Sequence, residues 1–186
     1  MAEKQQVVII GTGWGGYRLG HGIDHNQYDI TLISPDNTFA VTPLLASAAC
    51  GLFDPRLAHE PIRRKGFQAK YIKALVLDID FKSQKLICQP AFDEVKDERF
   101  EVRYDKVIIT PGCRSNTFGI PGVAENAIAV KNVASANAVR SRLNDILEMA
   151  SLPGISEAQQ RKLLHIVVCR WWSYWNRGRS RVDGSF

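Results

Sequence analysis

Residues 7–16 read Val-Val-Ile-Ile-Gly-Thr-Gly-Trp-Gly-Gly, an apolar run followed by glycines in the spacing GxGxxG. The β-branched run is typical of a buried strand, and a second apolar run at residues 30–33 predicts the next strand. A strand, a glycine turn, a helix and a second strand, in that order, form the unit that binds dinucleotides. This stretch therefore predicts an α/β chain with a dinucleotide site at residues 11–16.

Each glycine of the motif has its own expected role. Gly11 permits the tight turn, Gly13 lets the backbone approach a pyrophosphate, and Gly16 lets the helix lie close to the strand. The start of the helix then offers free N–H groups and a positive dipole end to the phosphates. Gly20 and Gly22 lie inside the expected helix, which runs to near His25; each costs about 1 kcal/mol relative to alanine, so close packing must compensate.

Length and composition bound the remaining possibilities. The chain has 186 residues, a net charge of +5 and 45% hydrophobic residues, which predicts one globular domain, or one and part of a second. No apolar run approaches the roughly 20 residues that span a bilayer, and the short stretch before residue 7 leaves no room for a targeting peptide. Residues 169–186 carry four arginines and one aspartate, so they hold +3 of the charge; the basic balance therefore does not indicate a nucleic-acid-binding protein.

Cysteine and histidine spacing argues against several kinds of site. The cysteines form no CxxC or other close pair, which disfavours a disulfide framework, a zinc site and a dithiol redox centre. We interpret them as buried and inert, and the histidines as structural or surface residues without metal-ligand spacing. These residues are Cys50, Cys88, Cys113 and Cys169, and His21, His25, His59 and His165.

The end of the second strand departs from the usual dinucleotide pattern. An acid that binds ribose hydroxyls normally stands there, but this chain has Ser34, with Asp36 two residues later. The chain also lacks any Tyr-x-x-x-Lys pair. Both observations disfavour a simple NAD-dependent dehydrogenase. The apolar, small-residue segment 39–51 is interpreted either as core packing or as a wall against a flat cofactor ring.

The rest of the chain predicts further elements of an α/β fold. Residues 70–88 predict short strands, 93–103 an exposed hairpin or loop, and 104–112 a buried strand that ends in a glycine turn. Ligands of such folds bind at the carboxyl ends of the strands, so Thr110, Pro111 and Gly112 are expected to converge with residues 11–16 and Ser34.

Helical and strand patterns continue towards the C-terminus. Residues 133–150 predict an amphipathic helix, which Pro153-Gly154 ends. Ser156 to Gln159 form a capping box for a short helix, and residues 163–168 predict another buried strand.

Together these segments resemble the type II NADH dehydrogenases, the FAD-containing NADH:quinone oxidoreductases, and especially the fungal mitochondrial kind. The resemblance extends over residues 7–168. Its marks are Ile10 to Gly16, Ile33-Ser34-Pro35, Phe39 with Thr42-Pro43-Leu44-Leu45, Glu60-Pro61, Tyr104-Asp105 and Thr117 to Gly122.

The resemblance implies a fold of two dinucleotide-binding domains. It implies a Rossmann-like FAD-binding domain over residues 1–155, incomplete, and the first helix and strand of the NADH domain over residues 156–168, where the chain would be truncated. The FAD-binding residues that it implies are Gly11, Thr12, Gly13, Trp14, Gly15, Gly16 and Ser34, Pro43 and Leu44 beside the flavin ring, Val76 at the adenine, and Thr110, Pro111 and Gly112 near the flavin. Pro111 departs from the family pattern and removes one N–H. The lone Cys50 disfavours the disulfide reductases, and no catalytic acid–base pair or metal is expected.

The implied activity is hydride transfer from NADH to FAD, followed by transfer of two electrons to a quinone. The resemblance also implies peripheral association with the inner mitochondrial membrane, whereas the absence of a presequence leaves a cytosolic location open. Alternatives are a non-catalytic FAD-binding module, a related flavoprotein reductase with another acceptor, and a nucleic-acid-binding tail on a Rossmann scaffold.

That tail, residues 169–186, interrupts the resemblance. It contains three of the four tryptophans, interleaved with tyrosine and arginine, which at face value suggests single-stranded nucleic acid. Because tryptophan has the single codon TGG, a shift of one base can turn Trp171, Trp172 and Trp175 into glycines and yield a second GxGxxG. We therefore expect an out-of-frame tail on an inactive fragment, rather than a nucleic-acid-binding segment.

Overall fold

The computed structural model describes residues 4–113 and 115–169. The chain forms two compact units, residues 1–141 and 142–186, whose boundary falls within helix α4. The described strands are β1 (Gln5–Ile10), β2 (Tyr28–Ser34), β3 (Thr38–Ala40), β4 (His59–Pro61), β5 (Lys70–Asp80), β6 (Lys85–Pro90), β7 (Phe100–Arg103) and β8 (Lys106–Ile109). The described helices are α1 (Trp14–Gly22), α2 (Thr42–Ala49), α3 (Val123–Asn126), α4 (Val133–Ala150) and α5 (Glu157–Leu163), with short 3-10 turns η1 (Pro55–Ala58) and η2 (Asp93–Val95).

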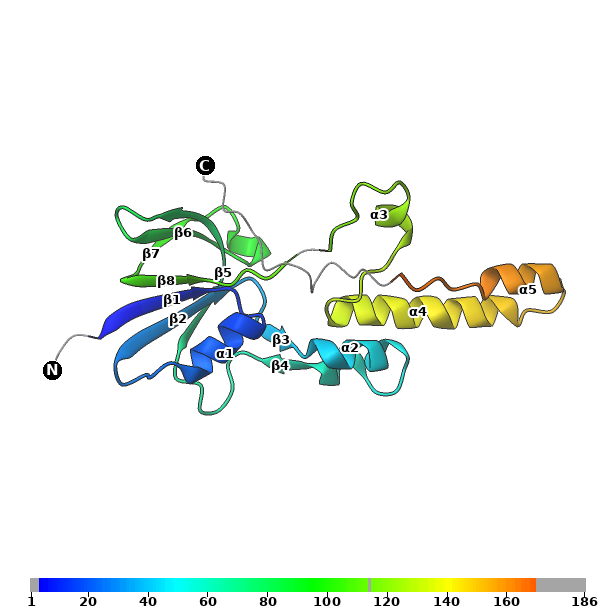
Figure 1. Ribbon diagram of the computed structural model, residues 1–186, viewed down its shortest axis with the longest axis horizontal. Helices are drawn as coiled ribbons and strands as arrows, with labels where there is room; N and C mark the ends of the chain where they lie inside the picture. The colour runs from blue at the N-terminus through cyan, green and yellow to red at the C-terminus, as the bar shows by residue number, and fades with distance from the viewer. Residues whose placement is uncertain (1–3, 114, 170–186) are drawn as a thin grey trace, which may run out of the picture. The chain divides into compact units, whose positions relative to one another are not determined.

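The first unit is built on a six-stranded sheet in the order β7-β6-β5-β2-β1-β8 (Figure 1). Strands β5, β2, β1 and β8 run parallel, and β5, β6 and β7 are antiparallel. The predicted strand, glycine turn, helix and strand are present as β1, α1 and β2. The α/β architecture expected from the sequence is therefore confirmed.

Alternation along β1 and β2 divides the core between the two faces of the sheet. Val7, Ile9 and Leu32 pack on the face that also receives Tyr17 and Leu19 of α1. Val8 and its neighbours pack on the opposite face against β6. Both faces of the central strands are thus covered, which explains their continuous apolar sequence.

Strand β5 connects the parallel part of the sheet to the antiparallel strands β6 and β7, and β6 packs on the face that carries Val8. The first residues of β5, 70–73, pair with β2, and residues 74–80 pair with β6, with a register shift between Val76 and Asp78. The bulge bends the strand, so that Leu86 and Cys88 of β6 are fully buried against the sheet. Part of the polar segment 93–103 is a strand, β7, which pairs with β6.

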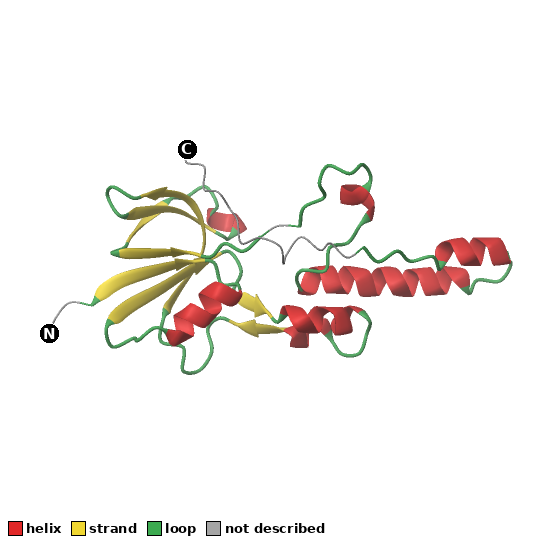
Figure 2. Cartoon of the chain, viewed as in Figure 1, coloured by secondary structure: helices red, strands yellow, loops and turns green. Residues whose placement is uncertain are grey.

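Helix α2 resolves the two interpretations of segment 39–51. Its Leu45, Ala48 and Ala49 pack against Ala58 and Ala136, whereas Thr42, Pro43 and Leu44 are exposed. One face of the segment is therefore core and the other is available to a ligand. In the chain, α2 lies between β3 and β4, and Figure 2 shows it at the end of this short strand pair.

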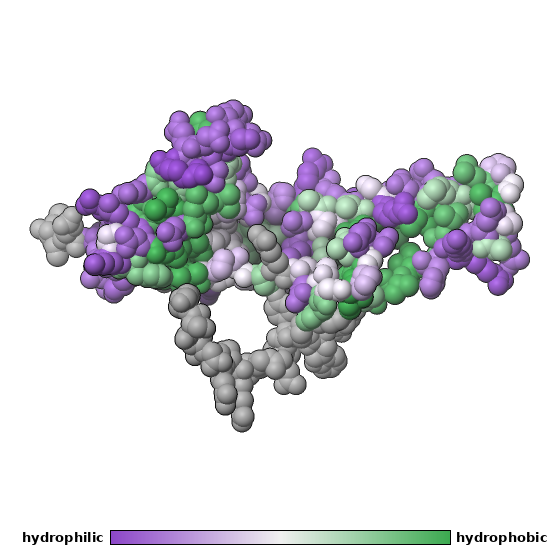
Figure 3. Space-filling view, turned by 90° about the horizontal axis from the view of Figure 1, so that it is seen from above, coloured by the Kyte–Doolittle hydropathy of each residue, from purple (hydrophilic) through white to green (hydrophobic). Residues whose placement is uncertain are grey.

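The second unit contains the rest of α4 and α5. Ser156 accepts a hydrogen bond from the backbone N–H of Gln159, and the Gln159 side chain accepts one from the Ser156 N–H, so the predicted capping box is confirmed. Several apolar side chains of this unit, such as Leu147 and Leu164, are exposed, and green areas mark the end of the molecule that carries α5 (Figure 3).

The buried strand expected at residues 163–168 is not formed. Helix α5 extends to Leu163, and the following residues are exposed, Val168 to 87%. A strand needs a neighbour to satisfy its backbone groups, and none of the described strands pairs with this segment. The predicted tail lies outside the described residues except for Cys169.

Three smaller expectations also change. The helix after the glycine motif ends at Gly22 rather than near His25. Strand β8 is partly exposed, with Ile109 at 51%, because among the described strands it pairs only with β1. Of the cysteines interpreted as buried, only Cys88 is; Cys50, Cys113 and Cys169 are exposed. No helix in the described part of the chain is both long and apolar enough to cross a membrane.

Candidate functional site

Three chain segments meet at the carboxyl ends of β1, β2 and β8. The Gly11 N–H donates to the Ile33 carbonyl at 2.8 Å, and the Thr110 N–H donates to the Ile10 carbonyl at 2.8 Å. The Thr12 hydroxyl donates to the Asp36 carbonyl at 3.3 Å. The sequence predicts that residues 11–16, Ser34 and residues 110–112 converge. These bonds confirm the convergence for the glycine turn, for the segment around Ser34 and for Thr110.

Two glycines of the motif, Gly11 and Gly16, occupy positions where a side chain would not fit. Gly11 has φ +95°, and a Cβ there would lie 2.2 Å from the Thr110 carbonyl oxygen. A Cβ at Gly16 would lie 1.8 Å from the Gly11 carbonyl oxygen. At Gly13, by contrast, a Cβ would meet no atom within 4 Å. Gly11 and Gly16 therefore allow close packing of the backbone, whereas Gly13 leaves open space beside it.

The start of α1 has the electrostatics of an anion site. Its N-cap, Gly13, provides no side-chain hydrogen bond, and the first turn contains no acidic residue. The first N–H groups and the positive dipole end of α1 are therefore without a capping side chain, and the space beside the Gly13 Cα is open. A pyrophosphate fits this arrangement of free donors and missing side chain.

The Thr110 side chain packs against the backbone of this turn. Its hydroxyl donates to the Ile10 carbonyl at 2.8 Å, and its methyl group lies 3.3 Å from where a Gly15 Cβ would be. Pro111 and Gly112 are exposed, and Gly112 has φ +74°. The geometry therefore gives the Thr110 side chain a place against the turn's backbone, while the next two residues lie at the surface of the site.

The end of β2 offers a carboxylate from Asp36 rather than a hydroxyl from Ser34. Ser34 is buried, and its oxygen accepts the Asp36 N–H at 3.3 Å. Tyr71 donates to the Ser34 carbonyl at 3.0 Å, and burial, with a smaller contribution from the Asp36 charge, raises the pKa of Tyr71 to about 12. Asp36 itself is exposed beside Thr12. The supporting role of Tyr71 had no signal in the sequence, because it depends on the pairing of β5 with β2.

Trp14 links the glycine turn to the exposed face of α2. Its indole N–H donates to the Thr42 hydroxyl at 3.0 Å, and its ring meets Phe39 edge-on at 4.8 Å. Pro43 and Leu44, which follow Thr42, are exposed, so their side chains are open to contact with a flat cofactor ring. Phe39 also stacks on Tyr17, three residues after Trp14, so the spacing of aromatic residues on α1 could have indicated this cluster.

Val76 lies farther along β5, in its antiparallel part. It is opposite Cys88, next to the register shift, and half-buried. Because Lys73 is level with Ser34 at the end of β2, Val76 lies beyond the carboxyl end of that strand. This position is on the same edge of the sheet as the glycine turn.

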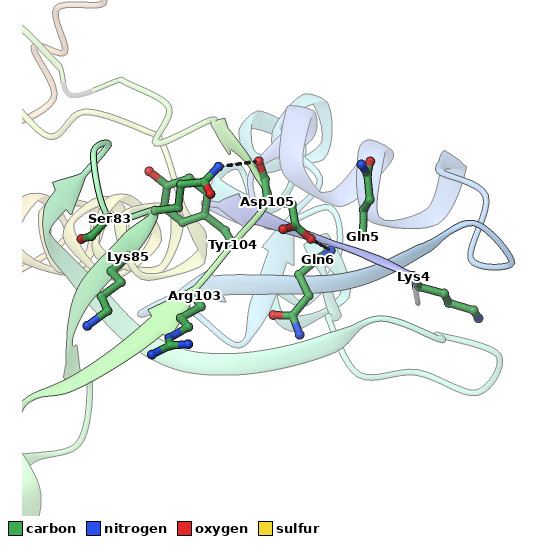
Figure 4. A pocket seen from close by; sticks show the side chains of 9 residues that line it. Lys4, Gln5, Gln6, Ser83, Lys85, Arg103, Tyr104 and Asp105 are labelled. Carbon is green, nitrogen blue, oxygen red and sulfur yellow. Dashed lines mark hydrogen bonds between the residues drawn. The ribbon is translucent and has the colours of Figure 1, made fainter. Parts of the chain in front are cut away.

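A hollow of about 730 Å³ lies at the opposite edge of the sheet, where β1 and β8 begin (Figure 4). Several of its polar groups already have partners within the chain. Asp105 accepts the Gln6 N–H at 2.6 Å, and its carbonyl accepts the Gln84 amide at 3.3 Å. Lys85 pairs with Glu101 at 2.6 Å. These pairings, and the distance along β1 from the glycine turn, favour the turn as the ligand site.

Comparison with known proteins identifies the family of the chain. Residues 5–169 match the family model described as pyridine nucleotide-disulphide oxidoreductase. The chain belongs to this family.

Relatives within the family agree with the resemblance to type II NADH dehydrogenases. The chain is 40% identical to the external alternative NAD(P)H-ubiquinone oxidoreductase B2, mitochondrial, of Arabidopsis thaliana, over 89% of this chain and 29% of that protein. It is 39% identical to a probable NADH dehydrogenase of Dictyostelium discoideum, over 89% of this chain and 37% of the relative. The structure of NDH2 from Plasmodium falciparum in complex with NADH superposes with a TM-score of 0.75 at 34% identity, covering 86% of this chain and 33% of the other.

These similarities confirm the recognised family and the flavoprotein-type α/β fold. The chain spans about a third of the length of the relatives that it matches. Within the described residues, no group of three or more metal-ligating side chains is present.

Proposed function

We propose that this chain supplies the FAD-binding part of an FAD-dependent NADH:quinone oxidoreductase. The observation that carries the proposal is the open space at Gly13 in front of the uncapped start of α1. The names of the relatives, NAD(P)H-ubiquinone oxidoreductases and NADH dehydrogenase, support this reaction class. Bound FAD would supply the chemistry, accepting hydride from NADH and passing two electrons to a quinone.

The chain's residues have distinct proposed tasks towards FAD. The backbone N–H groups from Gly13 to Gly16 bind the pyrophosphate, since they are free of side-chain caps. Pro43 and Leu44, with Pro111 and Gly112, border the flavin ring, because they are exposed at the same edge of the sheet. The backbone at Val76 contacts the adenine.

We assign the ribose to Asp36, with Ser34 as its support. The Ser34 oxygen accepts the Asp36 N–H, and Tyr71 fixes the Ser34 carbonyl, so this loop is held from two sides. The exposed Asp36 carboxylate can accept hydrogen bonds from both ribose hydroxyls. Asp36→Asn is expected to weaken FAD binding about tenfold, the effect of losing a charged acceptor.

The decisive experiment compares two glycines of the same helix. Gly13→Ala adds a Cβ where the structure has open space, so the variant is expected to fold and to lose FAD binding. Gly22→Ala adds the same group at the other end of α1, also in open space, and is expected to bind FAD like the wild type. Quenching of FAD fluorescence measures the binding. Equal affinities of Gly13→Ala and the wild type would contradict the site.

A non-catalytic FAD-binding module is the second candidate, because the chain spans only about a third of its relatives. We propose that the 186-residue chain alone has no NADH:quinone turnover. Addition of NADH to the FAD complex is then expected to leave the yellow flavin unbleached. Steady oxidation of NADH with a quinone acceptor would show that the chain itself is the enzyme.

Location and partners follow from the relatives. The Arabidopsis relative is named mitochondrial, and we propose the mitochondrion, at the surface of the inner membrane, with NADH and a quinone as partners of the complete protein. We also propose that residues 169–186 are read out of frame. Sequencing the transcript from the codon of Val168 tests this: recovery of a glycine-rich continuation supports it, and a confirmed Trp-Arg tail contradicts it.

A further inference from the structure

Trp14 makes contacts that the dinucleotide motif does not require. It is the first residue of α1, and its indole N–H donates to the hydroxyl of Thr42, the first residue of α2. Among the described residues, no other hydrogen bond joins these two helices. The starts of both helices are therefore tied together at one point.

The rest of the indole is held on one side only. Phe39, which is buried, meets the ring edge-on at 4.8 Å and itself stacks on Tyr17 at 4.4 Å. Even so, 54% of Trp14 remains exposed. An exposed tryptophan whose polar atom is bonded and whose ring is fixed is a rigid connection, because it has few other arrangements available.

This connection joins two parts of the proposed FAD site. The turn before Trp14 presents N–H groups to the pyrophosphate, and the turn after Thr42 presents Pro43 and Leu44 to the flavin ring. Neither helix has a side-chain cap at its start. The Trp14 bond therefore sets the spacing of two otherwise separate contact surfaces.

We propose that Trp14 is a positioning residue, whose hydrogen bond to Thr42 holds the first turn of α2 in register with the pyrophosphate turn. The proposal rests on FAD being the ligand. It predicts that loss of this bond changes the surroundings of the flavin ring as well as the affinity. A purely structural tryptophan would change the stability of the protein and leave the spectrum of the bound flavin unaltered.

Four variants test the bond. Trp14→Phe removes the N–H and keeps an aromatic ring, and Thr42→Val removes the acceptor and keeps the shape. Each is expected to weaken FAD binding about fivefold, the effect of one neutral hydrogen bond, and to shift the visible circular dichroism of the flavin. Thr42→Ser keeps the hydroxyl and is expected to retain both properties. The double variant Trp14→Phe/Thr42→Val is expected to bind FAD no more weakly than either single variant.

Matched controls separate this effect from general damage. Thr31→Val makes the same change on β2, and Trp171→Phe makes the same change outside the described residues; both are expected to match the wild type. Wild-type spectra and affinities in Trp14→Phe and Thr42→Val would overturn the proposal, as would additive losses in the double variant. Absence of FAD binding by the folded wild type would overturn the proposed function and this assignment together.

Discussion

Two similar β-branched runs of this chain have opposite surroundings. Val7 to Ile10 read Val-Val-Ile-Ile and form β1, where Val8 and Ile9 are at most 1% exposed. Ile166 to Val168 read Ile-Val-Val and form no strand, with exposures of 55% to 87%. The local preference for extended backbone is alike in both runs.

The difference between the two runs lies in their neighbours. Strand β1 has β2 on one side and β8 on the other, so its backbone groups are paired and its side chains meet both core clusters. None of the described strands pairs with residues 166–168. A run of this kind specifies a strand only where other parts of the chain supply the adjacent strands.

The largest expected effect tests this contrast directly. Ile9→Ala removes a fully buried side chain and is expected to lower the free energy of unfolding by about 2–5 kcal/mol. Ile166→Ala makes the same change at an exposed position, and we expect less than about 0.5 kcal/mol. Urea unfolding followed by far-ultraviolet circular dichroism measures both. A similar loss in the two variants would mean that residue 166 is buried in solution.

A second comparison is between two glycines of α1. The larger of the two losses of stability is expected to be somewhat smaller than that of Ile9→Ala. The Cβ of Gly16→Ala would lie 1.8 Å from the Gly11 carbonyl oxygen, so the helix must move away from the turn. We expect a loss of about 1–3 kcal/mol, typical of overpacking. Gly22→Ala has open space and is expected to be neutral or slightly stabilising. Thermal unfolding of the pair, in the same buffer, distinguishes the two positions; equal melting temperatures would contradict the close contact at Gly16.

Features that depend on nearby residues were predicted well from the sequence. The β1-α1-β2 unit follows from hydrophobic runs and glycine spacing, and the capping box at Ser156 follows from residues three apart. The compensation expected at Gly20 is also present, since a Cβ there would lie 3.0 Å from Leu32 Cδ1. Each of these features is decided within one or two elements of the chain.

Features that depend on distant pairing were predicted poorly. The inward-turned Ser34 and the supporting Tyr71 result from the pairing of β2 with β5, which no local pattern encodes. The Thr110 hydroxyl bonds to Ile10, a hundred residues earlier in the chain. The sequence placed Ser34 and Thr110 at the site but not Tyr71, and the tasks of all three residues required the register of the sheet.

The buried Tyr71 side chain is expected to make the stability of the protein depend on pH in the alkaline range. Burial raises its pKa from about 10 to about 12, so folding favours the neutral phenol. The resulting stability is fully present below pH 10 and is lost as the pH rises through 12. Tyr71→Phe is expected to lose about 1 kcal/mol at pH 8, from its hydrogen bond to Ser34, and to lack this alkaline decline.

Unfolding free energies between pH 8 and pH 11.5, together with tyrosine absorbance at 295 nm, test this expectation. Tyr28→Phe, a change at a half-buried tyrosine of β2, serves as the control and is expected to retain the decline because Tyr71 is kept. Identical pH profiles of Tyr71→Phe and the wild type would show that Tyr71 does not cause it.

The smallest expected effect lies in the second unit, where helix α5 depends on its own cap. Ser156→Ala removes the acceptor for the Gln159 N–H and the partner of its side chain, and is expected to destabilise α5 by about 1 kcal/mol. Because α5 has no buried residues, this loss should appear as faster amide exchange in residues 157–163 and leave the unfolding of the sheet unchanged. Ser151→Ala, just after α4, changes a hydroxyl that donates to the Glu148 carbonyl and to no other described residue, and is expected to leave α5 unaffected. If Ser156→Ala also lowered the stability of the sheet, α5 would contribute to the core that buries β1. The difference between residues 7–10 and 166–168 would then be smaller than their exposures indicate.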